Sequence, residues 1–240
     1  MYVIFTRKLR KKKFQLEIRT VMSNELEYRL TDDEQAENKG LSILDSLYGK
    51  CMQGVSPISD SVEKFAEDYL SQCNGDRELA VKKLVSNQVK KLSTTGFLTG
   101  FGGIITLPIS LPADIGSGLY VQMRMICAIA HLNGYDVKSD SVKTLVYTTL
   151  LGVKIGDLVK QVGLKVSEKT AYILLKKLPG KILVKINQKL GFRFITKFGT
   201  KGIVNLWKVV PVLPGIVNAG WNAVETEHIA ARAIKEFSPV

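Results

Sequence analysis

The chain has 240 residues, of which 45% are hydrophobic, and a formal net charge of +12. This apolar fraction suffices for a core and excludes a wholly disordered protein. Three cysteines without paired spacing argue against a disulfide framework or a zinc ribbon and fit a reducing compartment. The positive charge is concentrated in residues 154–208, which contain 13 basic residues but only Asp157 and Glu168 as acids. Such a patch attracts the phosphates of lipids or of nucleic acids.

The first 29 residues predict a basic, flexible extension that precedes the folded domain. A secretory signal places its charges before an apolar run, but here the apolar residues 2–5 precede the basic cluster at 7–13. The pattern is therefore not that of a secretory signal. We expect a single compact helical domain over residues 30–237.

Helical periodicity dominates that domain from its start. Residues 31–34 (Thr-Asp-Asp-Glu) have the pattern of a capping box, which predicts a helix with Leu41, Leu44 and Leu47 on its apolar face. A second helix is predicted over residues 60–73, with the Asn-Gly pair that follows as its stop. Its apolar face is formed by Val62, Phe65, Ala66, Tyr69 and Leu70.

Three further helices are predicted from the same signals. Asp76 is placed to cap one, Asp140 or Ser141 begins another, and Ser167-Glu168 opens a third that ends before Pro179. The expected inward residues are Leu79, Ala80, Leu84 and Val85 in the first of these and Val142, Leu145, Val146 and Thr149 in the second. Alternation with a period of two residues between Asn-Gly or Asp-Gly turns does not occur, so the predicted fold class is all-α.

Two stretches without charged residues interrupt this pattern, at 96–113 and 209–224. A membrane-spanning helix needs about 20 apolar residues, and both stretches are shorter and contain two prolines each. We therefore expect glycine- and proline-rich hydrophobic hairpins that are buried in the domain. The alternative is a hairpin that re-enters or inserts into a membrane.

Asp114 and Arg124 are the lone charges in the apolar segment 112–132. Ten residues apart on one helix, they would lie about 15 Å from each other and could not pair. Asp114 is placed near a helix N-terminus, where a carboxylate is favourable, and Arg124 is expected to form a buried inter-helix pair. Alternatively, these two candidate functional charges contact a ligand or a lipid headgroup.

Catalytic and metal-binding patterns are weak. The Glu-x-x-His unit formed by Glu225 and His228 occurs once, whereas di-iron bundles use it twice. The glycines at 96–103 lack the Gly-Lys-Ser/Thr of a phosphate loop, and no Gly-x-Ser-x-Gly occurs. We therefore predict no catalytic residue, no metal site and no cofactor, and a function that is not enzymatic.

A ladder of basic residues runs through 177–201, with one at every fourth position. Its members are Lys177, Lys181, Lys185, Lys189, Arg193, Lys197 and Lys201. A four-residue repeat drifts by about 40° per step around a helix, so one continuous helix would wind these charges around its circumference. With a bend at Gly191, the stretch instead predicts two short amphipathic helices, each with a basic arc beside an apolar arc.

This basic hairpin has three interpretations. It is the solvated outer face of helices packed on the core, a surface that docks on anionic lipid, or a nucleic-acid groove. The aromatic residues lie on the apolar arcs rather than among the lysines, which argues against nucleic acid. A solvated face is the simplest interpretation, and lipid docking is the leading functional one.

Two segments of the chain resemble the signature of the EcsC-like family of bacterial proteins. They cover residues 93–136 and 178–237 and contain the Gly-Phe, Leu-Pro, Pro-Ala-Asp and Asn-Gly-Tyr-Asp clusters. The resemblance implies a helical, hydrophobic, membrane-associated bacterial protein, and it carries over no catalytic residues.

We accordingly expect a cytoplasmic protein, peripheral to the inner face of the cell membrane. It would dock on anionic lipid or on a membrane-protein partner through the basic ladder, in an oligomeric state that the sequence leaves open. One alternative is a toxin- or immunity-type protein whose hairpin at 96–113 inserts into a membrane. Another is a lipid-acting enzyme that uses Asp114 with Arg124.

Overall fold

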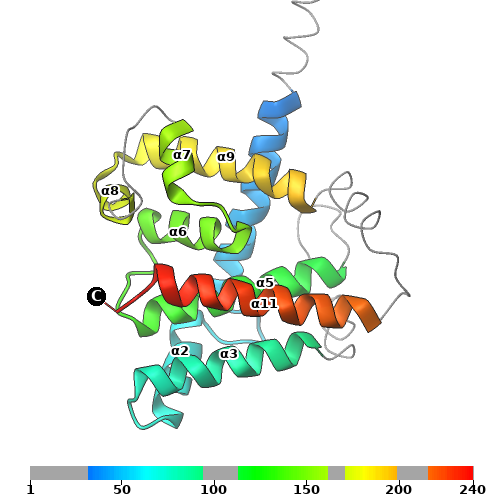
Figure 1. The fold of residues 1–240 in the computed structure, drawn as a ribbon, viewed down its shortest axis with the longest axis vertical. Helices are drawn as coiled ribbons and strands as arrows, with labels where there is room; N and C mark the ends of the chain where they lie inside the picture. The colour runs from blue at the N-terminus through cyan, green and yellow to red at the C-terminus, as the bar shows by residue number, and fades with distance from the viewer. Residues whose placement is uncertain (1–31, 94–112, 162–170, 199–215, 240) are drawn as a thin grey trace, which may run out of the picture.

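The computed structural model describes residues 32–93, 113–161, 171–198 and 216–239 (Figure 1). In these ranges it contains nine helices and no strand, which confirms the predicted all-α fold. The first helix covers residues 32–53 and is here termed the N-terminal helix. The others are α2 (Val62–Gln72), α3 (Arg77–Ser93), α5 (Ala113–Leu132), α6 (Asp140–Leu151), α7 (Ile155–Gln161), α8 (Ala171–Lys177), α9 (Gly180–Phe198) and α11 (Ile216–Glu236).

Helix α5 lies at the centre of the molecule. It packs against α2, α3, α6 and α11, while α9 and α3 lie at opposite ends of the stack (Figure 1). Between residues 116 and 132, only Arg124 and His131 are partly exposed. This burial explains why the sequence of α5 is apolar all round instead of amphipathic.

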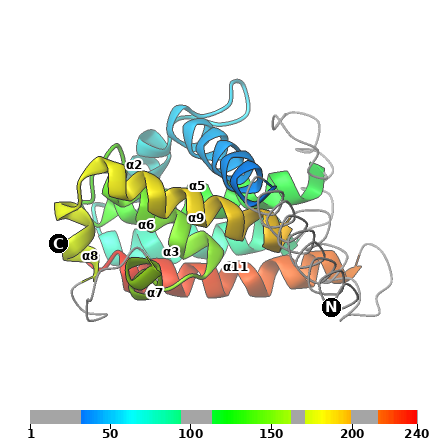
Figure 2. The same ribbon diagram turned by 90° about the horizontal axis from the view of Figure 1, so that it is seen from above.

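The N-terminal helix crosses α9, α6 and α5 along its length (Figures 1 and 2). The Tyr48 ring packs edge-on against Tyr147 of α6, with 5.7 Å between the ring centroids. The Tyr48 hydroxyl donates a hydrogen bond to the carbonyl oxygen of Val137 at 2.5 Å. Further along, Cys51 Sγ lies 3.7 Å from the carbonyl oxygen of Tyr120 on α5. One helix near the start of the chain therefore holds three later helices together.

The structure confirms the predicted stop of α2 and the predicted cap of α3, and it adds a cap at the start of α2 that was not predicted. Ser61 Oγ accepts a hydrogen bond from the backbone N–H three residues later, at 3.3 Å. Asn74 and Gly75 have positive φ angles of 53° and 84° and end α2. Asp76 Oδ1 then accepts a hydrogen bond from the backbone N–H of Leu79 at 3.0 Å, which caps α3.

The predicted inward faces are confirmed with one exception. All four residues predicted to face inward on α6 are buried, and α6 begins at Asp140 as expected. On α3, Leu79 was predicted to be inward but is 51% exposed, whereas Val81 is buried. The buried stripe of α3 runs through Ala80, Leu84 and the residues one turn further on, and Leu79 lies on the opposite side of the helix.

The predicted bend at Gly191 is wrong. Helix α9 is continuous from Gly180 to Phe198, and Gly191 is buried in its middle. A Cβ atom at Gly191 would lie 2.2 Å from the carbonyl oxygen of Glu37, and one at Gly40 would lie 1.9 Å from the carbonyl oxygen of Gly191. Two glycines thus let the backbones of α9 and the N-terminal helix touch, and the glycine is a contact point instead of a hinge.

The Asn-Gly-Tyr-Asp cluster at 133–136 fastens the end of α11 to the end of α5. Asn133 Nδ2 donates a hydrogen bond to the carbonyl oxygen of Phe237 at 2.6 Å, and the Tyr135 hydroxyl donates one to that of Ser238 at 2.8 Å. The rings of Tyr135 and Phe237 also meet edge-on, with centroids 5.2 Å apart. Gly134, with φ at +87°, makes the turn that allows this. The cluster therefore has a structural role.

Nearly all of the first uncharged stretch, at 96–112, and the beginning of the second, at 209–215, lie outside the described residues, so the predicted hairpins stay predictions. Helix α5 begins at Ala113, one residue after Pro112, and Asp114 lies in its first turn as expected. Residues 216–224 form the first turns of α11. Within the described ranges, no helix combines the length and the apolar character that crossing a bilayer requires.

Candidate functional site

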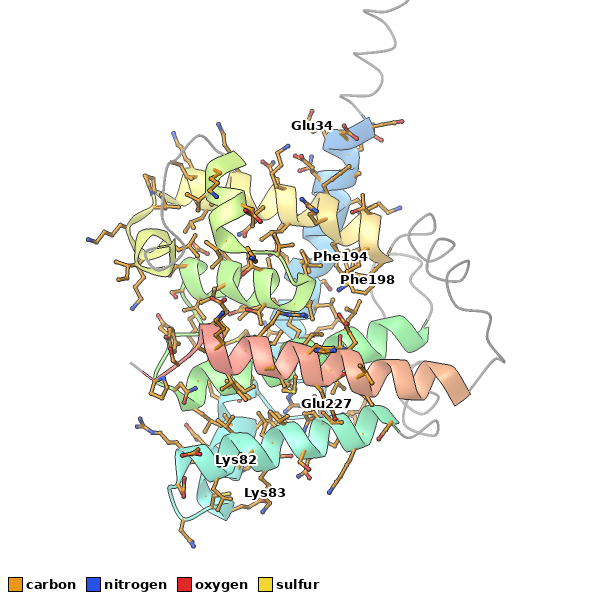
Figure 3. All side chains as sticks on the ribbon, viewed as in Figure 1. Glu34, Lys82, Lys83, Phe194, Phe198 and Glu227 are labelled. Atoms are coloured by element: carbon orange, nitrogen blue, oxygen red, sulfur yellow. The ribbon has the colours of Figure 1, made fainter. Side chains whose placement is uncertain are left out.

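The basic ladder lies mainly on α9, whose two sides differ in exposure. The buried residues are Leu183, Ile186, Asn187, Leu190, Gly191 and Phe194. The exposed ladder residues on α9 are Lys181, Lys185, Lys189 and Arg193. Figure 3 shows Phe194 and Phe198 on the side of α9 that faces the rest of the protein. The sequence predicted two short amphipathic helices, but the structure has one continuous amphipathic helix, α9, which contains most of the ladder.

Because α9 is continuous, the ladder winds around the helix, and two of its later members, Lys189 and Lys197, find partners on neighbouring helices. Lys189 Nζ lies 2.5 Å from Glu37 Oε1 of the N-terminal helix, and Lys197 Nζ lies 3.1 Å from Glu225 Oε1 of α11. These ion pairs tie α9 to its neighbours. Lys201 lies outside the described residues. Sequence patterns missed both pairs, because each acid lies on a different helix and no local signal reports it.

The earlier ladder residues gather where α8 meets α9. Helix α8 ends at Lys177, and Lys181 and Lys185 follow on the first two turns of α9. In the part of the chain that the structure describes, none of these three lysines forms an ion pair. Ile173 on α8 and Val184 on α9 are each 53% exposed. These five residues are termed the basic end.

The backbone adds positive potential at the basic end. In the first turn of α9, the N–H groups of Ile182 and Leu183 donate to the carbonyl oxygen of Pro179, and the turn contains no acidic residue that would offset the positive end of the helix dipole. Lys181 stands in this turn, where a cation opposes the helix dipole and does not stabilise the helix. On α8, by contrast, Lys177 stands at the C-terminal end, where a cation is favourable. An anion at the basic end would be attracted both by the lysines and by the positive end of the α9 dipole.

Arg124 has a different partner from the one predicted. Its Nη2 donates a hydrogen bond to the carbonyl oxygen of Asp60 at 2.8 Å, and its guanidinium lies over the Phe65 ring, 4.0 Å from the centroid. Among the described residues it forms no ion pair, so a carbonyl and a ring take the place of the expected inter-helix pair. Asp114 lies ten residues earlier on α5, and its side chain is not among those described.

The described residues contain no group of three or more His, Cys, Asp or Glu that could hold a metal ion. Glu225 is engaged by Lys197 and Arg232, at 3.1 and 3.9 Å, whereas His228 is exposed. The thiols of Cys51 and Cys127 are buried, and burial raises the pKa of both. They therefore stay protonated at neutral pH and are not thiolate nucleophiles.

One comparison with known proteins, the match to a protein-family model, covers nearly the whole chain. The model of the EcsC protein family matches residues 8–238, which include the N-terminal helix, the glycine contact and the basic end. The comparison with curated proteins and that with solved structures found no match. The match covers nearly the whole chain and so does not rest on one motif. The chain therefore belongs to the EcsC protein family.

Proposed function

We propose that this protein binds the anionic face of a membrane peripherally, through the basic end of α8 and α9. One observation carries the proposal: within residues 173–185, at the end of α8 and the start of α9, three lysines and two aliphatic side chains, Ile173 and Val184, are exposed. Lysines attract anionic headgroups, and aliphatic side chains enter the boundary between headgroups and acyl chains. The inner face of the cell membrane, which carries anionic lipid, is the expected surface.

The strength of such binding follows from the number of lysines. Each basic residue near an anionic surface contributes about 1 kcal/mol, so three contribute about 3 kcal/mol, or roughly a hundredfold in partitioning. Ile173 and Val184 add to this, because each still exposes about half of its surface to water. Binding of this size is reversible and sensitive to salt.

The arrangement favours lipid over nucleic acid. Proteins that bind single strands place aromatic side chains among their basic residues, where bases stack on them. On α9, Phe194 and Phe198 face the rest of the protein (Figure 3), and the third aromatic residue, Phe192, is half-buried. The exposed apolar side chains described at the basic end, Ile173 and Val184, are aliphatic instead. An acidic segment of a membrane protein would use the same lysines, and the test below separates it from lipid.

Co-sedimentation with vesicles tests the proposal. The wild-type protein should bind vesicles of phosphatidylcholine mixed with phosphatidylglycerol at low salt and bind them more weakly at high salt. It should not bind vesicles of pure phosphatidylcholine. The basic-end variant, in which Lys177, Lys181 and Lys185 are each replaced by Glu, should lose this binding by about a hundredfold or more. Since all three side chains are exposed, the variant should keep its fold, which circular dichroism checks.

A matched control separates a local site from net charge alone. The α3 variant replaces the exposed Arg77, Lys83 and Lys90 by Glu and so removes the same charge from the opposite end of the stack (Figure 3 labels Lys83). It should bind the vesicles like the wild type. Equal loss in both variants, or unchanged binding of the basic-end variant, would overturn the proposal. If the wild type binds no vesicle at all, lipid docking is wrong and a protein partner becomes the better explanation of the basic end.

A further inference from the structure

Helix α11 presents one side to the solvent. It packs against α3, α5 and α6, and it lies along one edge of the molecule in Figure 2. In the part of α11 whose side chains are described, the residues on one side are buried, among them Thr226, Ile229 and Ala233. On the opposite side, exposed residues recur every three or four positions, as they do on one stripe of a helix. They are Val224, Glu227, His228, Ala231, Ile234 and Lys235, and this stripe is termed the α11 face.

Half of the α11 face is apolar. Val224 is 52% exposed and Ile234 is 45% exposed, although valine and isoleucine are among the residues that proteins most often bury. Ala231, which lies between them, is also exposed. Contact with a partner would remove these side chains from water, which is favourable in proportion to the apolar area that is buried.

The charged residues of the α11 face have no partner in the part of the chain that the structure describes. Glu225, on the flank of the same helix, is engaged by Lys197 and Arg232. Glu227 and Lys235, by contrast, form no ion pair with any described residue. They stand eight residues apart, or about 12 Å along the helix axis, and so cannot pair with each other. One acid and one base are therefore available to a second molecule.

The α11 face is arranged symmetrically about Ala231. Glu227 and Lys235 lie four residues before and after it, and His228 and Ile234 lie three residues before and after it. Two copies of α11 related by a two-fold axis through Ala231 would run antiparallel, so that a residue before the axis on one copy faces a residue after it on the other.

In this arrangement the two copies complement each other. Glu227 of each copy meets Lys235 of the other, which gives two ion pairs, and the ring of His228 meets the aliphatic side chain of Ile234. Ala231 meets its own counterpart at the axis, where its small side chain lets the two helices approach closely. No like charges of the α11 face are placed opposite each other.

We propose that the α11 face is the contact between two copies of this chain, which form a two-fold symmetric dimer around Ala231. A contact made by one helix is smaller than that of a permanent dimer, so the dimer is weak and reversible, with a Kd on the order of 10–100 µM. Each copy carries a net charge of +12, which opposes association, and the local ion pairs offset this repulsion. The α11 face and the basic end are on different helices, so this proposal does not depend on membrane docking.

Sedimentation equilibrium of the full chain at constant ionic strength tests the dimer. The average mass of the wild type should rise with concentration from that of a monomer toward twice that value. Glu227→Lys places lysine against Lys235 at both ends of the contact and should raise the Kd by about tenfold or more. The double variant Glu227→Lys, Lys235→Glu exchanges the two charges and should restore the wild-type Kd. Circular dichroism checks that each variant is folded.

Two outcomes of sedimentation would overturn the proposal. The control Asp68→Lys changes the net charge equally, at an exposed residue of α2, and should leave the Kd unchanged. If it weakens the dimer as much as Glu227→Lys does, or if the double variant stays as weak as the single one, the ion pairs do not exist. A wild type that remains monomeric up to about 300 µM has no dimer of the proposed strength, and the α11 face is then not a contact between copies.

Oxidative crosslinking locates the two-fold axis. In Ala231→Cys the two new thiols meet at the axis, within the Cα separation of about 7 Å that a disulfide requires, so mild oxidation should yield a covalent dimer. The control Val224→Cys places its thiols about 21 Å apart along the helix axes and should stay monomeric. The native cysteines that the structure describes are buried and should not contribute. Equal crosslinking of both variants, or of neither, would refute an axis at Ala231.

Discussion

Replacing Gly191 by alanine perturbs the contact between α9 and the N-terminal helix at one atom. The added Cβ would lie 2.2 Å from the carbonyl oxygen of Glu37 and 2.5 Å from the backbone nitrogen of Leu41. Real Cβ atoms essentially never come closer than 3.0 Å to another heavy atom, so the two helices would separate by roughly 1 Å. Both obstructing atoms belong to the backbone and cannot rotate away.

Two effects of opposite sign determine the size of the change. Alanine favours a helix interior over glycine by about 0.5–1 kcal/mol. Forcing an extra carbon into a packed contact typically costs about 1–3 kcal/mol, and a backbone obstruction belongs at the upper end of this range. We therefore expect Gly191→Ala to lower the free energy of unfolding by about 1–2 kcal/mol. For a chain of this length, that corresponds to a fall in Tm of about 2–8 °C.

Urea unfolding followed by circular dichroism measures this change, with calorimetry as a second probe. The control is Gly49→Ala on the N-terminal helix, where a Cβ would meet no atom within 4 Å. That variant should be more stable than the wild type by about 0.5–1 kcal/mol, because only the helix preference acts. If Gly191→Ala is as stable as the wild type, or if both variants shift in the same direction, the close contact is not the reason for the glycine.

Two other predictions concern the buried core. Asn133→Ala leaves the carbonyl of Phe237 without its donor and should lower the free energy of unfolding by about 1–3 kcal/mol in the same assay; an unchanged urea midpoint would refute the role of the hydrogen bond. All three cysteines are buried, so native protein should react with Ellman's reagent only as fast as it unfolds, and reach three thiols in denaturant. Rapid labelling of any thiol in the native protein would contradict this.

Helix ends could be predicted from the sequence because capping is a local property. The acceptor in Asp76 and the donor N–H of Leu79 are three residues apart, and no other part of the chain is needed to bring them together. The prediction of which side of α3 is buried was less accurate than the prediction of its cap. Leu79 is apolar and was placed inward, but it lies away from the helices that cover Ala80. Local sequence patterns therefore predict where a helix begins more reliably than which parts of the chain the helix contacts.

Gly191 shows why the rest could not be predicted. Its position is in phase with the buried residues Leu183, Leu190 and Phe194, which is the signal of one continuous helix. Whether a glycine in such a helix is a bend or a contact depends on the surface that it meets. Here that surface contains Gly40, which only the tertiary structure brings near.

The same reasoning applies to the basic ladder. Its regular spacing was evident, and so was its drift around a continuous helix. The ion pairs of Lys189 with Glu37 and of Lys197 with Glu225 depend on how the N-terminal helix and α11 pack on α9. The sequence therefore predicted a basic surface but could not divide it into residues that hold the fold and residues that remain exposed.

The N-terminal helix is synthesised early but packs against helices that are synthesised much later. Its Glu37 pairs with Lys189, 152 residues later. At about 5–20 residues per second, the helix leaves the ribosome roughly 8–30 s before α9 is available to it. During this interval α5 and α6 are made before α9, so the N-terminal helix, whose Ile43, Leu44 and Leu47 are fully buried in the finished protein, is covered only in part. The first helix in the described part of the chain is thus among the last to be fully covered, and its apolar face is the surface of the nascent chain that we expect chaperones to bind.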